Sequence, residues 1–223
     1  MKNLDLRSPS CLLFVGRPKR GKSNAIKHII LKHSLDKFPE SAKYEFGIVF
    51  TRTSFNNDYS FIPDEYVFDG YDESVLEKYL EGLKGEIAKG NKVPANYVIF
   101  DDLIGLLNKH DPFLINFFGT HRHTNTHIYL ATQHLKSGAN TTLREICTHA
   151  IVFNSKQTNT LQSLYENVGQ LFPTIGEFKD NFWDITKEPY TAMLYLQDAD
   201  NIEDNYMYYK APDTTNWEYR LDY

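Results

Sequence analysis

The sequence lacks any apolar run that approaches the roughly 18–20 residues needed to cross a bilayer as a helix. Its first ten residues, MKNLDLRSPS, carry no apolar signal core, so we expect neither export nor a membrane partner. Cysteine is scarce. Cys11 and Cys147 are the only two, and we expect them to be free, buried thiols in a reducing compartment.

An excess of positive charge is also missing, because the formal net charge is −5. A monomer that binds DNA through a broad basic face is usually cationic. Any nucleic-acid contact must therefore come from a local group of charges, for example loops that converge in the centre of a ring. Hydrophobic residues make up 41% of the 223 residues and charged residues 24%, which is typical of a globular protein with one substantial core.

A phosphate-binding pattern is present at residues 16–23, which read GRPKRGKS and fit G-x-x-x-x-G-K-[ST]. The apolar run 11–15 precedes it, and residues 24–30 continue as a helix. A turn between a buried strand and a helix presents backbone N–H groups and the positive helix end to an anion. The motif therefore predicts a nucleoside triphosphate site.

We expect ATP and Mg²⁺ as the cofactors of this site. Lys22 would reach the β- and γ-phosphates, and Ser23 would place its hydroxyl on Mg²⁺. Pro18 removes one potential backbone donor and stiffens the loop. The residues expected to bind the nucleotide are Gly16, Arg17, Pro18, Lys19, Arg20, Gly21, Lys22, Ser23 and Asn24.

Strand and helix patterns alternate along the chain, which predicts an α/β fold with a mostly parallel sheet and helices on both faces. Residues 1–223 are expected to form one domain. The aromatic segment 197–223 is a flexible tail, an arm on a neighbouring subunit, or a final strand plus extension. The expected strands are 11–15, 46–50, 66–68, 97–100, 127–132, 150–153 and 191–196, and the expected helices are 22–34, 73–88, 112–119, 141–147, 157–168 and 173–181.

Polar residues follow two of these strands. Asp101 and Asp102 come after the strand at 97–100, at the edge where such sheets bind ligands. Asp101 is expected to bind Mg²⁺ beside Ser23, and Asp102 to orient and deprotonate the attacking water. Gln133 would lie next to the γ-phosphate, on a strand between the two earlier ones. The alternatives are a turn or helix-cap role for Asp102 and a surface amide for Gln133.

In order and spacing, four segments resemble the FtsK/HerA superfamily: FVGRPKRGKSNAI, VIFDD, THRHTNTHIYLATQH and LREICTHAIVF. Within it, the sequence is most similar to the viral genome-packaging ATPases of the poxvirus A32-like kind. The resemblance covers about residues 10–155 and implies a RecA/ASCE-like P-loop NTPase fold. Arg122-His123 and Arg144 stand where these proteins have an Arg-His pair and an Arg. Asp102 departs from the Glu of many members.

The resemblance implies a homo-oligomeric ring that hydrolyses ATP to drive a double-stranded DNA genome into a preformed capsid. Its partners would be capsid or portal vertex proteins, in the host cytoplasm, a virus factory or the virion. Arg122 or Arg144 would be an arginine finger in the neighbour's site, with Arg20 as a third candidate. Both Arg122 and Arg144 are expected to flank the strands near Gln133.

Two other functions remain open: a P-loop nucleotide kinase, and a nucleotide-gated assembly factor with weak ATPase activity. A zinc site is disfavoured because the candidate histidines straddle a turn and a strand; they are His121, His123, His127 and His134. Arg52 and Lys109-His110 face either a DNA channel or solvent.

Overall fold

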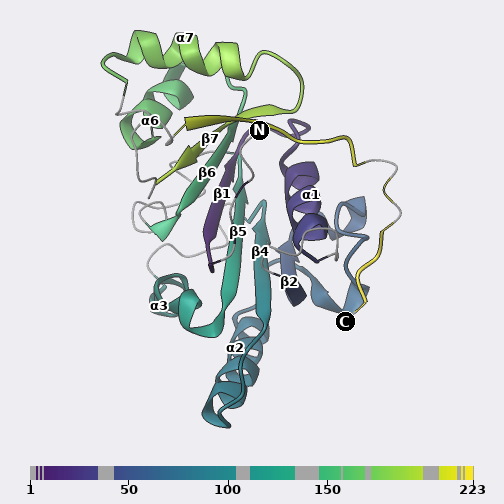
Figure 1. Ribbon diagram of the computed structural model, residues 1–223. Helices are drawn as coiled ribbons and strands as arrows, with labels where there is room; N and C mark the ends of the chain where they lie inside the picture. The colour runs from purple at the N-terminus through teal and green to yellow at the C-terminus, as the bar shows by residue number, and fades with distance from the viewer. Residues whose placement is uncertain are drawn as a thin grey trace.

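The computed structural model describes residues 4, 6, 8–34, 43–103, 111–133, 146–156, 158–168, 172–197, 206–214, 217 and 219–222. They form a central sheet with the strand order β3-β2-β4-β5-β1-β6-β7-β8 (Figure 1). The strands are β1 (Cys11–Val15), β2 (Tyr44–Thr51), β3 (Val67–Asp69), β4 (Ala95–Asp101), β5 (Thr126–Thr132), β6 (His149–Phe153), β7 (Thr191–Leu196) and β8 (Tyr206–Lys210).

Strands β1 to β6 pair in parallel, and β7 and β8 extend the sheet beyond β6 as antiparallel strands. β5 lies between β1 and β4, as expected for the strand that leads to Gln133. Its register aligns Thr132 with Val15, and Ala131 with Asp101. The carboxyl ends of β1, β4 and β5 therefore meet at one edge of the sheet, the edge at which the parallel strands end. This arrangement confirms the predicted P-loop fold.

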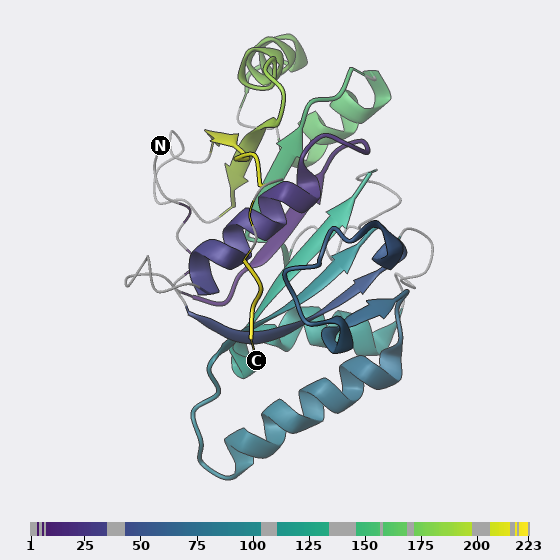
Figure 2. The ribbon, with the colours of Figure 1, turned by 90° about the vertical axis from the view of Figure 1, so that its right-hand side faces the viewer.

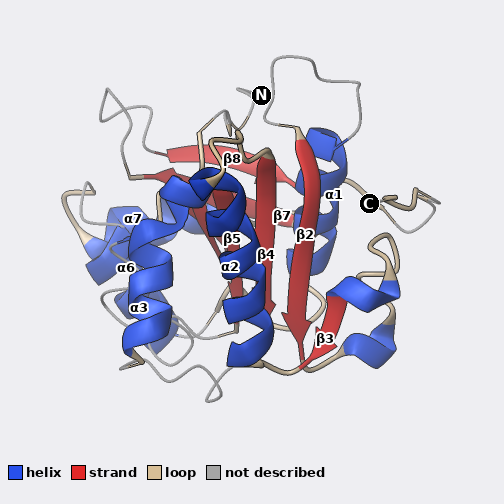
Figure 3. Ribbon diagram, turned by 90° about the horizontal axis from the view of Figure 1, so that it is seen from below, coloured by secondary structure: helices blue, strands red, loops and turns tan. Residues whose placement is uncertain are grey.

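Helices cover both faces of the sheet, with α1 on one face and α2, α3, α6 and α7 on the other (Figure 3). Alternation along β1 explains the two layers: Leu12 and Phe14 join the core beneath α1, and Leu13 and Val15 join the core on the opposite face. The helices are α1 (Lys22–Ser34), α2 (Glu73–Ala88), α3 (Pro112–Thr120), α6 (Thr158–Val168) and α7 (Ile175–Ile185).

Helix boundaries follow local capping. Asp72 accepts a hydrogen bond from the N–H of Ser74 at the start of α2, and Asp111 does the same for α3. α7 begins after its N-cap Thr174 and runs four residues beyond the predicted end at 181, because Phe178 and Phe182 are both buried on the helix face that packs on the sheet. Most of the helix expected at 141–147 lies outside the described residues.

The C-terminal segment is a final strand plus extension, one of the three alternatives (Figure 2). After β8 the chain crosses α1, where the ammonium of Lys27 donates to the carbonyls of Thr214 and Trp217, at 3.3 Å each. The N–H of Leu221 then donates to the carbonyl of Phe61 at 2.7 Å. The extension therefore packs on its own subunit.

Cys11 and Cys147 are free and buried, as expected, with their Sγ atoms 3.3 Å apart. Among the described residues, no helix combines the length and the apolar character needed to span a membrane.

Candidate nucleotide-binding site

The loop between β1 and α1 is fixed at both ends by glycines. The N–H of Gly16 donates to the carbonyl of Thr132 at 3.1 Å, which ties the loop to the end of β5. A Cβ on Gly16 would lie 2.8 Å from that of Phe153, closer than packing allows. Gly21 has φ +106°, and a Cβ there would lie 3.1 Å from the ring of Tyr190. Only glycine fits at either position without rearrangement.

Lys22 lies buried at the start of α1, inside the curve of this loop. Its ammonium donates to the carbonyls of Gly16 at 2.7 Å and Arg17 at 3.2 Å. Burial lowers the pKa of Lys22, and the nearby carboxylates of Asp101 and Asp102 oppose that shift. A cation is thus held between the loop and the two acidic residues. The side chains of residues 17–20 are exposed.

Asp101 is buried at the end of β4, and its Oδ2 accepts a hydrogen bond from the hydroxyl of Tyr59 at 2.8 Å. Burial raises the pKa of Asp101 to about 6, against the opposing effects of the Tyr59 hydrogen bond and the charge of Lys22. Asp58, beside Tyr59 in the loop after β2, acts electrostatically on both Lys22 and Asp101. We did not predict Tyr59 or Asp58, because their loop has no local pattern that signals a site.

Asp102 and Gln133 meet across the ends of β4 and β5. The amide Nε2 of Gln133 donates to Oδ1 of Asp102 at 3.0 Å, and the N–H of Asp102 donates to the carbonyl of Ala131 at 3.2 Å. Asp102 has φ +53°, a left-handed conformation that Asp tolerates better than most residues. The two residues expected to act on the γ-phosphate side are therefore hydrogen-bonded to each other.

The oxygen donors at this edge fit a hard cation such as Mg²⁺. They are the carboxylates of Asp101 and Asp102, and Asp101 keeps one oxygen without a Tyr59 bond. Ser23, a further candidate ligand, follows Lys22 at the start of α1. In the described part of the chain, no group of three or more His, Cys, Asp or Glu is arranged to hold a metal. Mg²⁺ usually binds through one or two carboxylates plus phosphates and waters, so this sparse donor set suits it.

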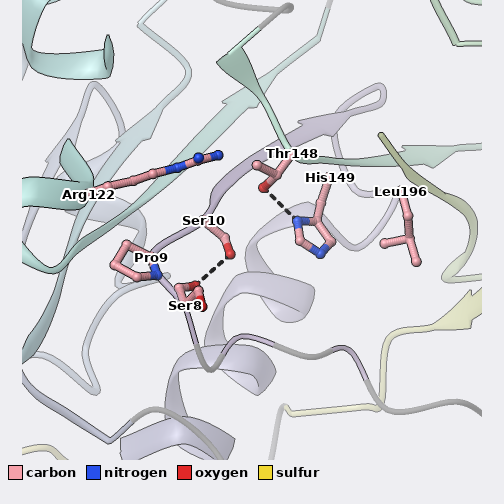
Figure 4. Close-up of a pocket in the computed structure, with 7 residues that line it drawn as sticks. All are labelled: Ser8, Pro9, Ser10, Arg122, Thr148, His149 and Leu196. Atoms are coloured by element: carbon pink, nitrogen blue, oxygen red, sulfur yellow. Dashed lines mark hydrogen bonds between the residues drawn. The ribbon is translucent and has the colours of Figure 1, made fainter. Parts of the chain in front are cut away.

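Arg122 does not lie near Gln133, which corrects our expectation. It belongs to the short turn η3 (His121–Thr124) before β5, whereas Gln133 follows the end of that strand. Seven residues of strand separate these ends by about 20 Å. Arg122 instead lines a cavity of about 460 Å³ at the opposite edge of the sheet, where the parallel strands begin (Figure 4). The other residues that line this cavity are Ser8, Pro9, Ser10, Thr148, His149 and Leu196.

The remaining candidates are dispersed. Arg144, Lys109-His110 and His134 lie outside the described residues. Arg52 is exposed. The other candidate histidines, which the structure does describe, do not form a metal site. His121 is buried with its Nδ1 2.6 Å from the carbonyl of Thr126, His127 is buried within β5, and His123 is exposed.

Solved structures with the same fold include the genome packaging NTPase B204 from Sulfolobus turreted icosahedral virus 2, in complex with AMPPCP. Its TM-score is 0.60 at 18% identity, over 92% of this chain and 98% of that chain. The cytoplasmic domain of the Type VII secretion ATPase EccC from Thermomonospora curvata has a TM-score of 0.62 at 13% identity, over 91% of this chain and 25% of that one. A search of curated proteins found no significant match.

A family model described as Poxvirus A32 protein matches residues 7–169. The match spans the phosphate loop, the acidic pair at the end of β4 and the strand that leads to Gln133. These are the segments on which the sequence resemblance depends. The chain therefore belongs to the Poxvirus A32 protein family.

Proposed function

We propose that this protein is a Mg²⁺-dependent ATPase that works as an oligomeric ring and drives a double-stranded DNA genome into a preformed capsid. One observation carries the proposal: Lys22, Asp101 and the Asp102–Gln133 pair converge at the edge formed by β1, β4 and β5. The family supports it, and so does the shared fold of a genome packaging NTPase solved with a nucleotide analogue.

In the proposed mechanism, residues 16–24 bind the triphosphate. The ammonium of Lys22 exchanges its neutral carbonyl partners for phosphate oxygens, because charged acceptors form stronger hydrogen bonds. Ser23 and Asp101 would hold Mg²⁺, which would supply positive charge against the charge that develops on the phosphates. Asp102 accepts the proton of the attacking water.

Gln133 connects this step to the state of the nucleotide. Its amide already donates to Asp102, so one group can report the γ-phosphate and orient the carboxylate that activates water. Loss of the γ-phosphate would then change the position of the Asp102–Gln133 pair at the ends of β4 and β5.

An arginine from another subunit completes the proposed site. Arg122 is about a strand length from its own phosphate loop, so it can act only on a neighbour's nucleotide. Arg144 is the second candidate for this role, and Arg20 the third. Such an arrangement requires a ring. It also explains how a chain of net charge −5 could act on DNA, because inward loops would gather local charge. We place the ring at a capsid or portal vertex, in the host cytoplasm, a virus factory or the virion.

The test is ATP turnover with and without double-stranded DNA, measured together with the mass of the assembly by light scattering. We expect an oligomer whose turnover rises with DNA. Lys22→Ala should abolish nucleotide binding, because it removes the charge that meets the β- and γ-phosphates. Wild-type turnover in Lys22→Ala would show that residues 16–23 are not the phosphate site.

The same assay separates the two rival functions. Transfer of the phosphoryl group to a nucleotide acceptor, without stimulation by DNA, would identify a nucleotide kinase. Normal ATP binding with no turnover, even in a DNA-bound oligomer, would identify a nucleotide-gated assembly factor.

A further inference from the structure

Tyr190 lies in the turn between α7 and β7 and combines two unusual features. Its backbone has φ +62°, a left-handed conformation that is rare for a bulky residue. Its side chain is 47% exposed although it is a large aromatic. Strained residues of this kind persist where the surrounding structure holds them, and they cluster at binding and catalytic sites.

The turn is held by several bonds. The carbonyl of Tyr190 accepts from the N–H of Ala211 at 3.0 Å, and the hydroxyl of Thr191 donates to the carbonyl of Glu188 at 2.7 Å. Lys210, at the end of β8, pairs with Glu188 at 2.9 Å. Bonds from the end of β8 and from within the turn therefore hold the strained backbone in place, and the ring of Tyr190 stays on the surface.

The ring borders the phosphate loop. A Cβ placed on Gly21 would lie 3.1 Å from Cδ1 of Tyr190 and 3.3 Å from Cε1 of Phe153. These two rings come from β6 and from the turn just before β7, on one side of β1. Asp101, Asp102 and Gln133 come from β4 and β5, on the other side.

A nucleotide must span these two sides. If its terminal phosphate meets the acidic pair and its phosphates lie on the loop at the end of β1, its base extends toward β6 and β7. Tyr190 is the exposed aromatic ring that meets the phosphate loop on that side, at Gly21.

We propose that Tyr190 is the base-stacking residue of the nucleotide site, with its ring against the face of the nucleobase. This inference rests on the proposed binding of a nucleotide at residues 16–24, and it assigns recognition of the base to Tyr190. Aromatic stacking tolerates any base, because every base has a π face. Tyr190 should therefore contribute affinity for ATP and GTP alike.

The test compares ATP with inorganic tripolyphosphate, which has the phosphates and no base, by titration calorimetry with Mg²⁺. Tyr190→Gly removes the ring and suits the positive φ, so the turn keeps its conformation. We expect it to weaken ATP binding by roughly ten-fold or more, as loss of one base stack does, and to leave tripolyphosphate binding unchanged. Tyr190→Phe should keep both affinities. Tyr208→Ala, at an exposed tyrosine on β8, is the matched control and should change neither.

Two results would overturn the inference. An equal loss of ATP and tripolyphosphate affinity in Tyr190→Gly would mean that the residue supports the loop and does not touch the base. Unchanged ATP affinity would mean that the base binds elsewhere. Failure of the proposed nucleotide binding at residues 16–24 is distinguishable, because the wild-type protein would then bind neither ligand and Lys22→Ala would have no effect. Failure of DNA-stimulated turnover alone would leave the two titrations, and the role of Tyr190, unaffected.

Discussion

Asp101 and Asp102 are adjacent in sequence but lie in different surroundings. Asp101 is buried, and Tyr59 donates to one of its oxygens. Asp102 is partly exposed, has a left-handed backbone and accepts from Gln133. Pairs of carboxylates in contrasting environments usually divide their chemical roles, and here the buried one suits a fixed metal ligand and the exposed one suits contact with water.

Asp102→Asn should therefore preserve ATP affinity and reduce hydrolysis by about 10²- to 10⁴-fold, the usual contribution of a positioned base. Asp101→Asn should instead weaken Mg²⁺-dependent nucleotide binding, because it removes charge from a metal ligand. Titrations of ATP and Mg²⁺, combined with turnover measurements, separate the two effects. Interchanged phenotypes would contradict the division of roles.

His127 is a buried histidine that we expect to lower the stability of the fold. Its ring is buried within β5, 4.9 Å from that of Tyr44, and neither ring nitrogen has a hydrogen-bond partner among the described residues. Burial lowers its pKa to about 3, with the charges of nearby histidines acting in the same direction.

The free energy of unfolding depends on pH wherever the folded and unfolded states bind different numbers of protons. Between pH 6.5 and about 3 the unfolded chain binds a proton on His127 that the folded protein does not, so His127 reduces the free energy of unfolding as pH falls. His127→Phe keeps the ring contact and removes two unpaired nitrogens. It should stabilise the fold by roughly 1–3 kcal/mol at neutral pH and make the acid slope shallower. Urea unfolding from pH 7.5 to 4.5 measures both, with the exposed His123→Phe as control. An unchanged slope in His127→Phe would contradict the prediction.

At the scale of elements, the pattern of strand ends predicted much of the site. The strands before residues 16, 101 and 133 could be recognised from apolar runs, and the carboxyl ends of parallel strands share one edge. Gln133 beside Asp102 follows from that rule. Arg122 could not be placed in the same way, because a turn before a strand lies at the opposite edge.

The contacts made by irregular segments could not be predicted from the sequence. Tyr59 meets Asp101 across 42 positions from a loop without periodicity, so no spacing rule indicates it. The C-terminal extension is similar: its aromatic residues disfavour complete disorder. Whether it packs on its own subunit or on a neighbour depends on tertiary contacts around Lys27 and Phe61, which no sequence pattern indicates.

The extension should contribute to the stability of the fold. Leu221 is buried in the core beneath α1, and its N–H bonds to the loop segment that carries Tyr59 and Phe61. Leu221→Ala should lower the free energy of unfolding by about 2–3 kcal/mol, because it leaves a cavity at a nearly closed site. The adjacent exposed Asp222→Ala should change it by less than about 0.5 kcal/mol. Equal effects of the two variants in chemical unfolding would show that the extension is not packed.

At the scale of the whole molecule, the sheet separates two functional edges. One edge carries the phosphate loop, the acidic pair and Gln133. The other carries Arg122 and its cavity. Under the proposed function, a subunit with its nucleotide at one end and its candidate finger at the other would not complete a site alone, and adjacent copies would supply each other's missing group.

Arg122→Ala should consequently leave ATP binding nearly intact and suppress turnover, because the lost charge acts on a neighbour's transition state. Lys22→Ala subunits bind no nucleotide but keep their arginine. Co-expression of the two variants should restore part of the activity, since a Lys22→Ala subunit completes the site of an Arg122→Ala neighbour. Arg144→Ala is tested in the same format, because either arginine fits the sequence. If mixed assemblies form, as mass spectrometry of tagged subunits would show, and neither arginine variant regains turnover, the site is self-contained and catalysis between subunits must be abandoned.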